Sequence, residues 1–205
     1  MITGPRYKIA KRLGASVFEK TQSQKFAISK ERTEKNKKRG RGRGRGGEYG
    51  KQILEKQKVR ITYGVTESQF GNYVKKALES EKGNPLERLH ESLELRLDNV
   101  IWRLGLTKTR RSARQMVAHG HVLINGKRVR VPSYQVALTD TIAVRDGSKK
   151  HGAFVGFEER FAERTLPSWL VWDAKKMEGK VVLRPTVVSA DPAGDLAMVL
   201  SFYTR

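Results

Sequence analysis

The stretch RLDNVIWRLGLTKTRRSARQMVAHGHVLINGKRV runs from Arg96 to Val129 and sets apolar residues among a long series of positive charges. Its first apolar residues recur at the spacing of one helical face: Leu97, Val100, Ile101 and Leu104. Gly105 follows them and is expected to end this helix. No Asp or Glu occurs between Asp98 and Asp140, so the segment predicts a folded element with a surface that is free of acid.

A second, shorter helix is predicted to follow Gly105. Thr109 stands at the position of an N-cap, and Gly120 stands where a helix often ends in a left-handed residue. The apolar residues expected to face the core are Ala113, Met116 and Val117. The residues expected on the opposite face, at i, i+1 and i+4, are Arg110, Arg111 and Arg114.

The next segment, HVLINGKRVRVP at residues 121–132, predicts two short strands joined by a turn at Asn125-Gly126. Both positions of that turn type need positive φ, which Asn and Gly adopt most easily. Side chains alternate along a strand, so Arg128 and Arg130 are expected on the face opposite to the valines. TIAVRDG, at residues 141–147, predicts a further strand.

Together the short helix and the hairpin predict one rigid basic surface. Most charge runs are simply solvated faces, but such faces mix signs, because like charges at i, i+4 repel by about 0.2–0.5 kcal/mol. The planar fork of arginine donates two parallel hydrogen bonds to a phosphate. We therefore predict that nucleic acid binds here, through Lys108, Arg110, Arg111, Arg114, Lys127 and Arg128.

Residues 48–95 predict a helical domain that packs as a small bundle. Thr66 and Gln69 have the spacing of a capping box, and Asn84 and Pro85 have the order of an N-cap and first helical residue. EYGKQILEKQKVRITYG, at residues 48–64, predicts the helix that precedes them. Its cations form a second set of predicted contact residues: Lys51, Lys56, Lys58 and Arg60.

The first 47 residues are expected to form a basic, poorly structured extension that cannot fold alone. Its end, KNKKRGRGRGRGG at residues 35–47, has low complexity and no acid. Glycine favours flexibility and like charges keep a chain extended. The third set of predicted contact residues lies in this tract: Arg41, Arg43 and Arg45.

The last third of the chain is mixed in character. Residues 153–167 look helical, whereas GKVVLRP at residues 179–185 and LAMVLSFYT at residues 196–204 look like strands. Trp169 and Trp172 are interpreted as packing residues, and Tyr63 and Tyr134 as candidates for stacking on bases or sugars. The pattern as a whole predicts an α+β protein.

Composition limits the classes of function. Lys and Arg number 42 and Asp and Glu 21, giving a net charge of +21 that favours an anionic partner. The absence of Cys excludes disulfides, thiolate metal sites and a Cys nucleophile. Histidine spacing suggests no metal site, and no catalytic constellation stands out, so neither a cofactor nor an enzyme is predicted. With no secretory signal or membrane-length apolar run, the sequence predicts a soluble cytoplasmic protein.

At this point a family resemblance becomes visible. Residues 96–136, RLDNVIWRLGLTKTRRSARQMVAHGHVLINGKRVRVPSYQV, resemble the S-four RNA-binding domain. EYGKQILEKQKVRITYGVTESQFGNYVKKA, PSWLVWDAKKMEGKVVLRP and GPRYKIAKRLG resemble the helical domain, the C-terminal region and the N-terminus of the bacterial S-four family of small-subunit ribosomal proteins. The resemblance covers nearly the whole chain in the right order.

The resemblance implies more than the residues alone do. It implies a basic extension at 1–47, a helical domain at 48–95 completed by the tail 184–205, and a mixed domain at 96–183 with the S-four motif at 96–157. It also implies primary binding to the five-prime domain of small-subunit ribosomal RNA, nucleation of assembly, a neighbouring protein S-five, and a contribution to translational accuracy. Messenger RNA near the entry channel is a further partner that the resemblance implies.

The sequence departs from the family pattern in two places, and two other classes of function compete with the one that the resemblance implies. Many family members bind zinc through N-terminal Cys residues, which this chain lacks, and many carry PGQHG where this chain has RGRGRGRGG. An RNA-modifying enzyme or a synthetase would need a catalytic domain beside the motif, and the remaining basic residues show none. A DNA-compacting protein is allowed by charge alone. Such a protein should bind duplex DNA and ribosomal RNA about equally tightly.

Overall fold

The computed structural model describes residues 4–15, 17–39, 47–80, 83–149, 165–173, 176–187 and 193–204. The chain divides into two units, one of Met1–Leu89 with Val188–Arg205 and one of His90–Val187. The expected domain boundaries after residues 47, 95 and 183 stay predictions. The RGRGRG tract with Arg41, Arg43 and Arg45, and most of the helix expected at 153–167, lie outside the described residues.

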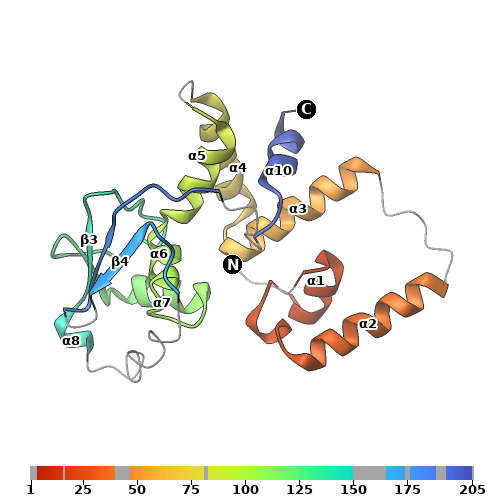
Figure 1. Cartoon of the computed structure of the whole chain (residues 1–205), viewed down its shortest axis with the longest axis horizontal. Helices are drawn as coiled ribbons and strands as arrows, with labels where there is room; N and C mark the ends of the chain where they lie inside the picture. Colours follow the sequence, from red (N-terminus) through yellow and green to blue (C-terminus); the bar gives the residue numbers. More distant parts are fainter. Residues whose placement is uncertain are drawn as a thin grey trace. The chain divides into compact units, whose positions relative to one another are not determined.

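The first unit is helical (Figure 1). Its helices are α1 (Arg6–Leu13), η1 (Glu19–Thr21), α2 (Gln24–Arg39), α3 (Glu48–Tyr63), α4 (Glu67–Glu79), the first part of α5 (Pro85–Glu94) and α10 (Leu196–Tyr203). The expected capping box is confirmed, because the Thr66 side chain accepts from the Gln69 amide and the Gln69 side chain accepts from the Thr66 amide. The side chain of Asn84 caps α5 by accepting from the amide of Leu86 at 3.0 Å.

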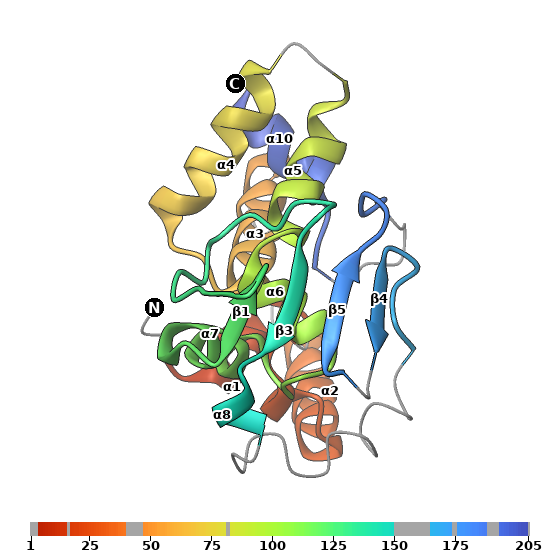
Figure 2. The ribbon, with the colours of Figure 1, turned by 90° about the vertical axis from the view of Figure 1, so that its left-hand side faces the viewer.

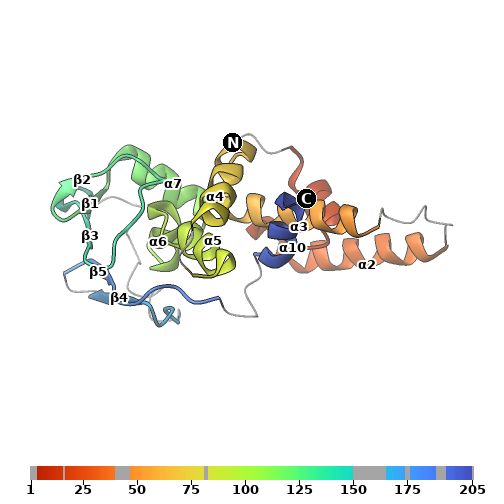
Figure 3. The same cartoon turned by 90° about the horizontal axis from the view of Figure 1, so that it is seen from above.

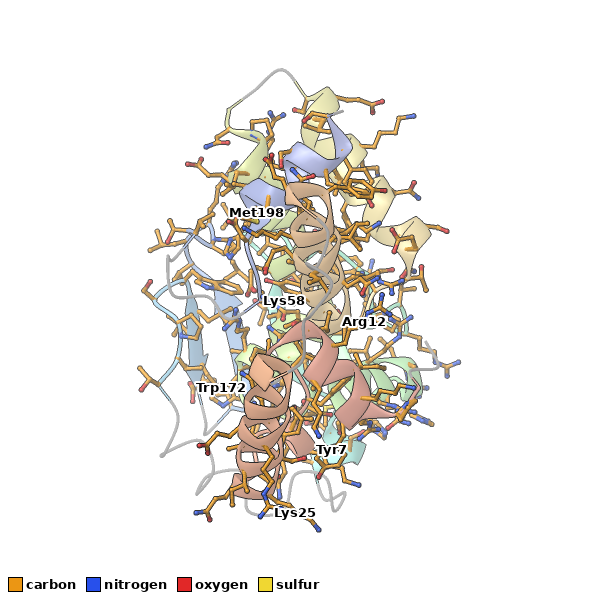
Figure 4. All side chains as sticks on the ribbon, turned by 90° about the vertical axis from the view of Figure 1, so that its right-hand side faces the viewer. Tyr7, Arg12, Lys25, Lys58, Trp172 and Met198 are labelled. Atoms are coloured by element: carbon orange, nitrogen blue, oxygen red, sulfur yellow. The ribbon has the colours of Figure 1, made fainter. Side chains whose placement is uncertain are left out.

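The described part of the N-terminal extension contributes helices to this unit. α1 contacts α3, and Ala10, Leu13 and Phe26 are buried. The ring of Tyr7, labelled in Figure 4, lies 5.6 Å from that of Phe26. These apolar residues, scattered in the sequence, thus find partners in helices of the same unit.

The C-terminal segment 196–204 is a helix, and the strand expected there is wrong. The Asp195 carboxylate accepts from the amides of Ala197 and Met198 and begins α10. α10 lies against α3 (Figure 3), and the Tyr49 and Phe202 rings stack at 5.7 Å. A short apolar run does not distinguish strand from helix by periodicity, so the cap and the packing decide.

The second unit holds the α+β part of the fold, which confirms the predicted class. The rest of α5 is followed by α6 (Leu97–Arg103), α7 (Arg110–His119), β1 (Val122–Ile124), β2 (Lys127–Arg128), β3 (Thr141–Val144), α8 (Asp146–Lys149), β4 (Leu170–Asp173) and β5 (Glu178–Val181). Its described strands form an antiparallel sheet in the order β2-β1-β3-β5-β4 (Figure 2).

One apolar core lies between this sheet and the helices α6 and α7. It includes all the residues predicted to face inward from the two helices, and Trp169 and Trp172 pack in it as predicted. α5 ends at Glu94 and α6 begins at Leu97, so Leu95 and Arg96 lie between the two helices. Arg96 is fully buried at this break and forms an isolated bridge with Gln135. The core therefore provides a rigid base for α7 and the hairpin.

Candidate nucleic-acid interface

Helix α7 is fixed by the signals that its sequence predicted. The Thr109 hydroxyl accepts from the amide of Ser112 at 2.8 Å, and Gly120 ends the helix with a φ of 71°. Ala113, Met116 and Val117 are buried. Because that face is buried, Arg111 on the other side of α7 is exposed.

The hairpin after α7 also follows its prediction. Asn125 and Gly126 have φ angles of 51° and 75°, and β1 pairs with β2 antiparallel in the register Leu123↔Arg128 and Ile124↔Lys127. The second strand is short: β2 ends at Arg128, and of the valines that follow, Val129 packs against the core while Val131 is exposed. Lys127 is exposed beside the turn.

Arg128 joins the hairpin to the end of α7. Its Nε donates to the Gly120 carbonyl at 2.8 Å, and its Nη2 donates to the His119 carbonyl at 2.7 Å. A cation is favoured there, since the C-terminal carbonyls of a helix carry a partial negative charge. The RNA contact expected of Arg128 stays a prediction. Within the protein, Arg128 binds the end of α7.

Further cations gather around Arg128. Desolvation and then the positive charges of Arg130 and Arg145 lower its pKa below the usual value, so these guanidinium groups lie close enough to repel one another. Arg145 follows β3, and its amide donates to the His121 carbonyl at 2.9 Å, which places it beside the start of β1. The sequence reasoning missed Arg145, although it lies within the strand predicted at residues 141–147.

We call the cations of α7, of the turn before it and of the strand ends beside it the basic face. Its members are Lys108, Arg111, Arg114, Lys127, Arg128, Arg130 and Arg145. Arg114 is half-buried and the others are exposed. Every residue of the first predicted set of contact residues except Arg110 is a member of the basic face.

Arg110 is held within the unit. Its Nε donates to the Asn99 side-chain oxygen at 2.7 Å, and its guanidinium lies 3.7 Å from the centre of the Trp102 ring. Such a cation–π contact is worth about 0.5–2 kcal/mol. Arg111, the next residue, is exposed. Two neighbouring arginines that look equivalent in the sequence therefore have different environments.

Three acids near the basic face in sequence are buried, whereas Asp146, next to Arg145, is exposed and pairs with Lys149 at 2.8 Å. Glu94 is 1% exposed, Asp98 is 4% exposed and Asp140 is 6% exposed. Glu94 accepts from Arg103 at 2.7 and 2.8 Å, and Asp98 accepts from Arg96 at 2.7 and 3.0 Å. The region without an exposed carboxylate thus extends, in this fully described stretch, from residue 92 to residue 145.

The second predicted set, on α3, has a different environment. Lys51 is exposed. Lys56 and Arg60 pair with Glu67 at 2.6 and 3.1 Å, and Lys58 pairs with Glu55. Lys56 also lies 4.4 Å from the centre of the Phe202 ring in α10. Figure 4 labels Lys58 on α3 and Met198 on α10.

Other predicted features have smaller consequences. Tyr63 is 3% exposed and packs in the core, so its stacking role is wrong. Tyr134 remains accessible, and burial together with the charge and hydrogen bond of Asp140 raises its pKa. Within the described ranges, no His, Asp and Glu side chains group as a metal site would require. Nor does any described helix have the length and apolarity needed to cross a bilayer.

Comparison with known proteins identifies two family models and several related proteins. The model of the ribosomal protein S4/S9 N-terminal domain matches residues 1–94, and that of the S4 domain matches residues 95–142. The chain is 39% identical over 203 residues to the small ribosomal subunit protein uS4 of Limosilactobacillus reuteri subsp. reuteri, covering 99% of this chain and 98% of that protein. It is 46% identical over 158 residues to the protein of the same name from Pelotomaculum thermopropionicum, covering 77% and 76% of the two chains.

These matches extend over both units of the fold and include α7 and the hairpin. The chain therefore belongs to the family of the small ribosomal subunit protein uS4, which consists of non-enzymatic structural proteins of the ribosome with an RNA-binding S4 domain.

Proposed function

We propose that this protein is a primary binder of the five-prime domain of small-subunit ribosomal RNA, and that the basic face makes its central contact. The observation that carries the proposal is the exposed cations of α7 and the hairpin, combined with the burial of Glu94, Asp98 and Asp140. A surface of this kind attracts phosphates, and the exposed carboxylate next to it in sequence, Asp146, is paired with Lys149 at 2.8 Å.

The contacts are expected to be mainly to phosphate and sugar. Arginine guanidinium groups on a helix and a hairpin, both packed on one core, present donors at fixed spacing. RNA of matching shape would meet several of them at once, whereas an arbitrary polyanion would meet fewer. Specificity would then come from the spacing of the phosphates in the folded RNA.

The cations of α3 and of the RGRGRG tract form the outer part of the proposed contact. Lys51 is exposed and available. Lys56, Lys58 and Arg60 would have to exchange Glu55 and Glu67 for phosphate, so they should contribute less per residue. Arg41, Arg43 and Arg45 are proposed as contacts from their sequence alone.

The wider role follows from the family resemblance. By binding the five-prime domain early, the protein would nucleate assembly of the small subunit in the cytoplasm. It would lie beside protein S-five and near the path of messenger RNA, and would contribute to translational accuracy with S-five.

A competition titration tests the proposal. The labelled ligand is the five-prime domain of small-subunit ribosomal RNA, and the competitors are scrambled RNA of equal length and duplex DNA, at several salt concentrations. A preference for the ribosomal RNA that persists at high salt is expected, because purely electrostatic binding falls steeply with salt and ignores the competitor's identity. Equal competition at every salt concentration would indicate a general polyanion binder.

Charge reversal locates the contact. Arg111→Glu with Arg114→Glu should weaken binding by about 100-fold, since each charge-assisted hydrogen bond contributes about 1.5–3 kcal/mol. Lys75→Glu with Lys76→Glu is the matched control, because both lysines are exposed on α4 and the change in net charge is the same. Equal losses in the two variants would remove the basic face from the central contact.

A further inference from the structure

Asp140 is the first acid after the long basic segment. It is buried and lies immediately before β3 in the chain. Its Oδ1 accepts from the Asn125 side-chain amide at 2.7 Å. Its Oδ2 accepts from the backbone amide of Ala137 at 2.9 Å and from the Tyr134 hydroxyl at 3.3 Å. A carboxylate with partners on both oxygens is thus placed directly against the turn of the hairpin.

The residue that Asp140 holds is the first residue of that turn. Asn125 has a positive φ, and its side-chain oxygen accepts from the amide of Thr141 at 2.9 Å. The backbone amide of Asn125 donates to the Thr141 carbonyl at the same distance. The side chain of Asn125 therefore bridges Asp140 and β3, and it fixes the turn from the side.

The other end of the hairpin is fixed by Arg128 on the carbonyls of α7. Lys127 lies between the attachment at Asn125 and the attachment at Arg128, and only Gly126 separates it from Asn125. The positions of both cations relative to α7 depend on both attachments. Without the contact at Asp140, the Asn125 side chain would keep only its bond from the Thr141 amide.

We propose that Asp140 is a positioning residue for RNA binding, which acts through Asn125 to hold Lys127 and Arg128 in register with the arginines of α7. This inference rests on the proposed function. The expected effect of Asp140 on RNA affinity is unusual, because a negatively charged residue strengthens binding to a polyanion. Its charge is buried and occupied, so it adds little repulsion at the surface while it fixes the spacing of the cations.

An acid is required at this position by the inventory of donors. The Asn125 amide, the Ala137 amide and the Tyr134 hydroxyl all approach Asp140 as donors, and only a carboxylate accepts on both oxygens. An asparagine at position 140 would turn an NH2 group against one of them. Burial and the charge of Asp140 raise the pKa of Tyr134, whose hydroxyl donates to Asp140.

The test exchanges the two side chains. Asp140→Asn places two donors face to face, and Asn125→Asp places two carboxylates face to face, whereas the double variant restores donor to acceptor with every other partner retained. We expect Asp140→Asn to weaken binding of the five-prime domain RNA by about tenfold, as one unsatisfied buried group would. Asn125→Asp should weaken it at least as much, and the double variant should return to within about threefold of the wild type.

Asp173→Asn is the matched control. Asp173 is exposed on β4, so the same change of charge should leave binding unchanged or slightly tighter. Circular dichroism establishes that each variant is folded at the assay temperature. If Asp140→Asn does not fold, Tyr134→Phe removes a single donor at an accessible side chain and should weaken binding by about twofold to threefold.

The outcomes separate the inference from the proposed function. If the wild type prefers the ribosomal RNA and Asp140→Asn binds as tightly as it or tighter, Asp140 is not a positioning residue. The same conclusion follows if the single variants are weak and the double variant is no better. A wild type without preference for the ribosomal RNA would overturn the proposed function, and the inference with it.

Discussion

The basic face of the second unit and helix α3 of the first unit both carry several cations in the sequence and have different surroundings in the structure. Around the basic face, Glu94, Asp98 and Asp140 are buried and bonded internally, and the exposed Asp146 pairs with Lys149. At α3, Glu55 of the same helix and Glu67 of α4 pair with the cations of α3. The comparison shows that the placement of acids, as much as the number of cations, decides which surface is available to an anionic partner.

The acids in the two regions also differ in what they stabilise. Glu94 joins α5 to α6, because it accepts from Arg103 and from the Asn99 side chain while it is buried. Asn99 in turn accepts from Arg110 at the start of α7. Glu67 is half-exposed and binds Lys56 and Arg60 near the surface. The first network joins α5, α6 and the start of α7, and the second pairs charges between α3 and α4.

The largest effect is expected from breaking the buried network. Glu94→Gln should lower the free energy of unfolding by about 3 kcal/mol, since it leaves Arg103 with an uncompensated charge in a mostly buried site. Glu67→Gln should lower it by less than about 1 kcal/mol, because exposed ion pairs contribute little. Urea unfolding of the two variants measures both values. Similar losses would mean that burial does not distinguish the two networks.

Neutralising cations tests which region contacts RNA. Arg111→Gln with Arg114→Gln should weaken binding of the five-prime domain RNA by about 10-fold to 100-fold and reduce the salt dependence by roughly two phosphate contacts. Lys56→Gln with Arg60→Gln should weaken it by less than about threefold, since these cations already interact with Glu67.

A titration of RNA into each double variant at several salt concentrations gives both quantities. An equal loss on α3 would show that RNA displaces Glu67. In that case Glu67→Gln should strengthen binding, because it would release Lys56 and Arg60 for phosphate.

The smallest effect is expected at the glycines that end the two helices. Gly64 after α3 and Gly120 after α7 both have positive φ, so alanine at either position costs about 1–2 kcal/mol of strain. At Gly64 an added Cβ meets no other atom within 4 Å, whereas at Gly120 it meets the Arg128 guanidinium. Thermal unfolding should therefore show a larger loss for Gly120→Ala than for Gly64→Ala.

Only Gly120→Ala should also weaken RNA binding, by about threefold to tenfold, because it displaces Arg128 from the α7 carbonyls. If both variants lose the same stability and neither changes RNA binding, the contact between Arg128 and α7 does not position the hairpin.

Signals that act within a few residues were predicted from the sequence. The caps at Thr66, Thr109 and Gly120 and the turn at Asn125-Gly126 formed as expected, because each depends on the conformational preference of a residue and on a partner close to it in the chain. The inward face of α7 followed from its periodicity.

Features that depend on distant residues were not predicted. α10 was expected to be a strand, and its rings pack on α3 at Tyr49 and on α4 at Phe70. Arg110 looked equivalent to Arg111, and only the packing of α6 against α7 placed Trp102 and Asn99 beside it. The pairing of Lys56 and Arg60 with Glu67 joins two helices, and no spacing within α3 indicates it.

The sequence by itself determined the α+β class, the family, the inward face of α7 and the long interval without acid. The tertiary structure alone decided which cations remain available to RNA and which acids are withdrawn from the surface. The reason is physical: helix faces and turns are set by neighbouring residues, whereas the electrostatic environment of a side chain is set by all the charges and the low-dielectric core that folding brings around it.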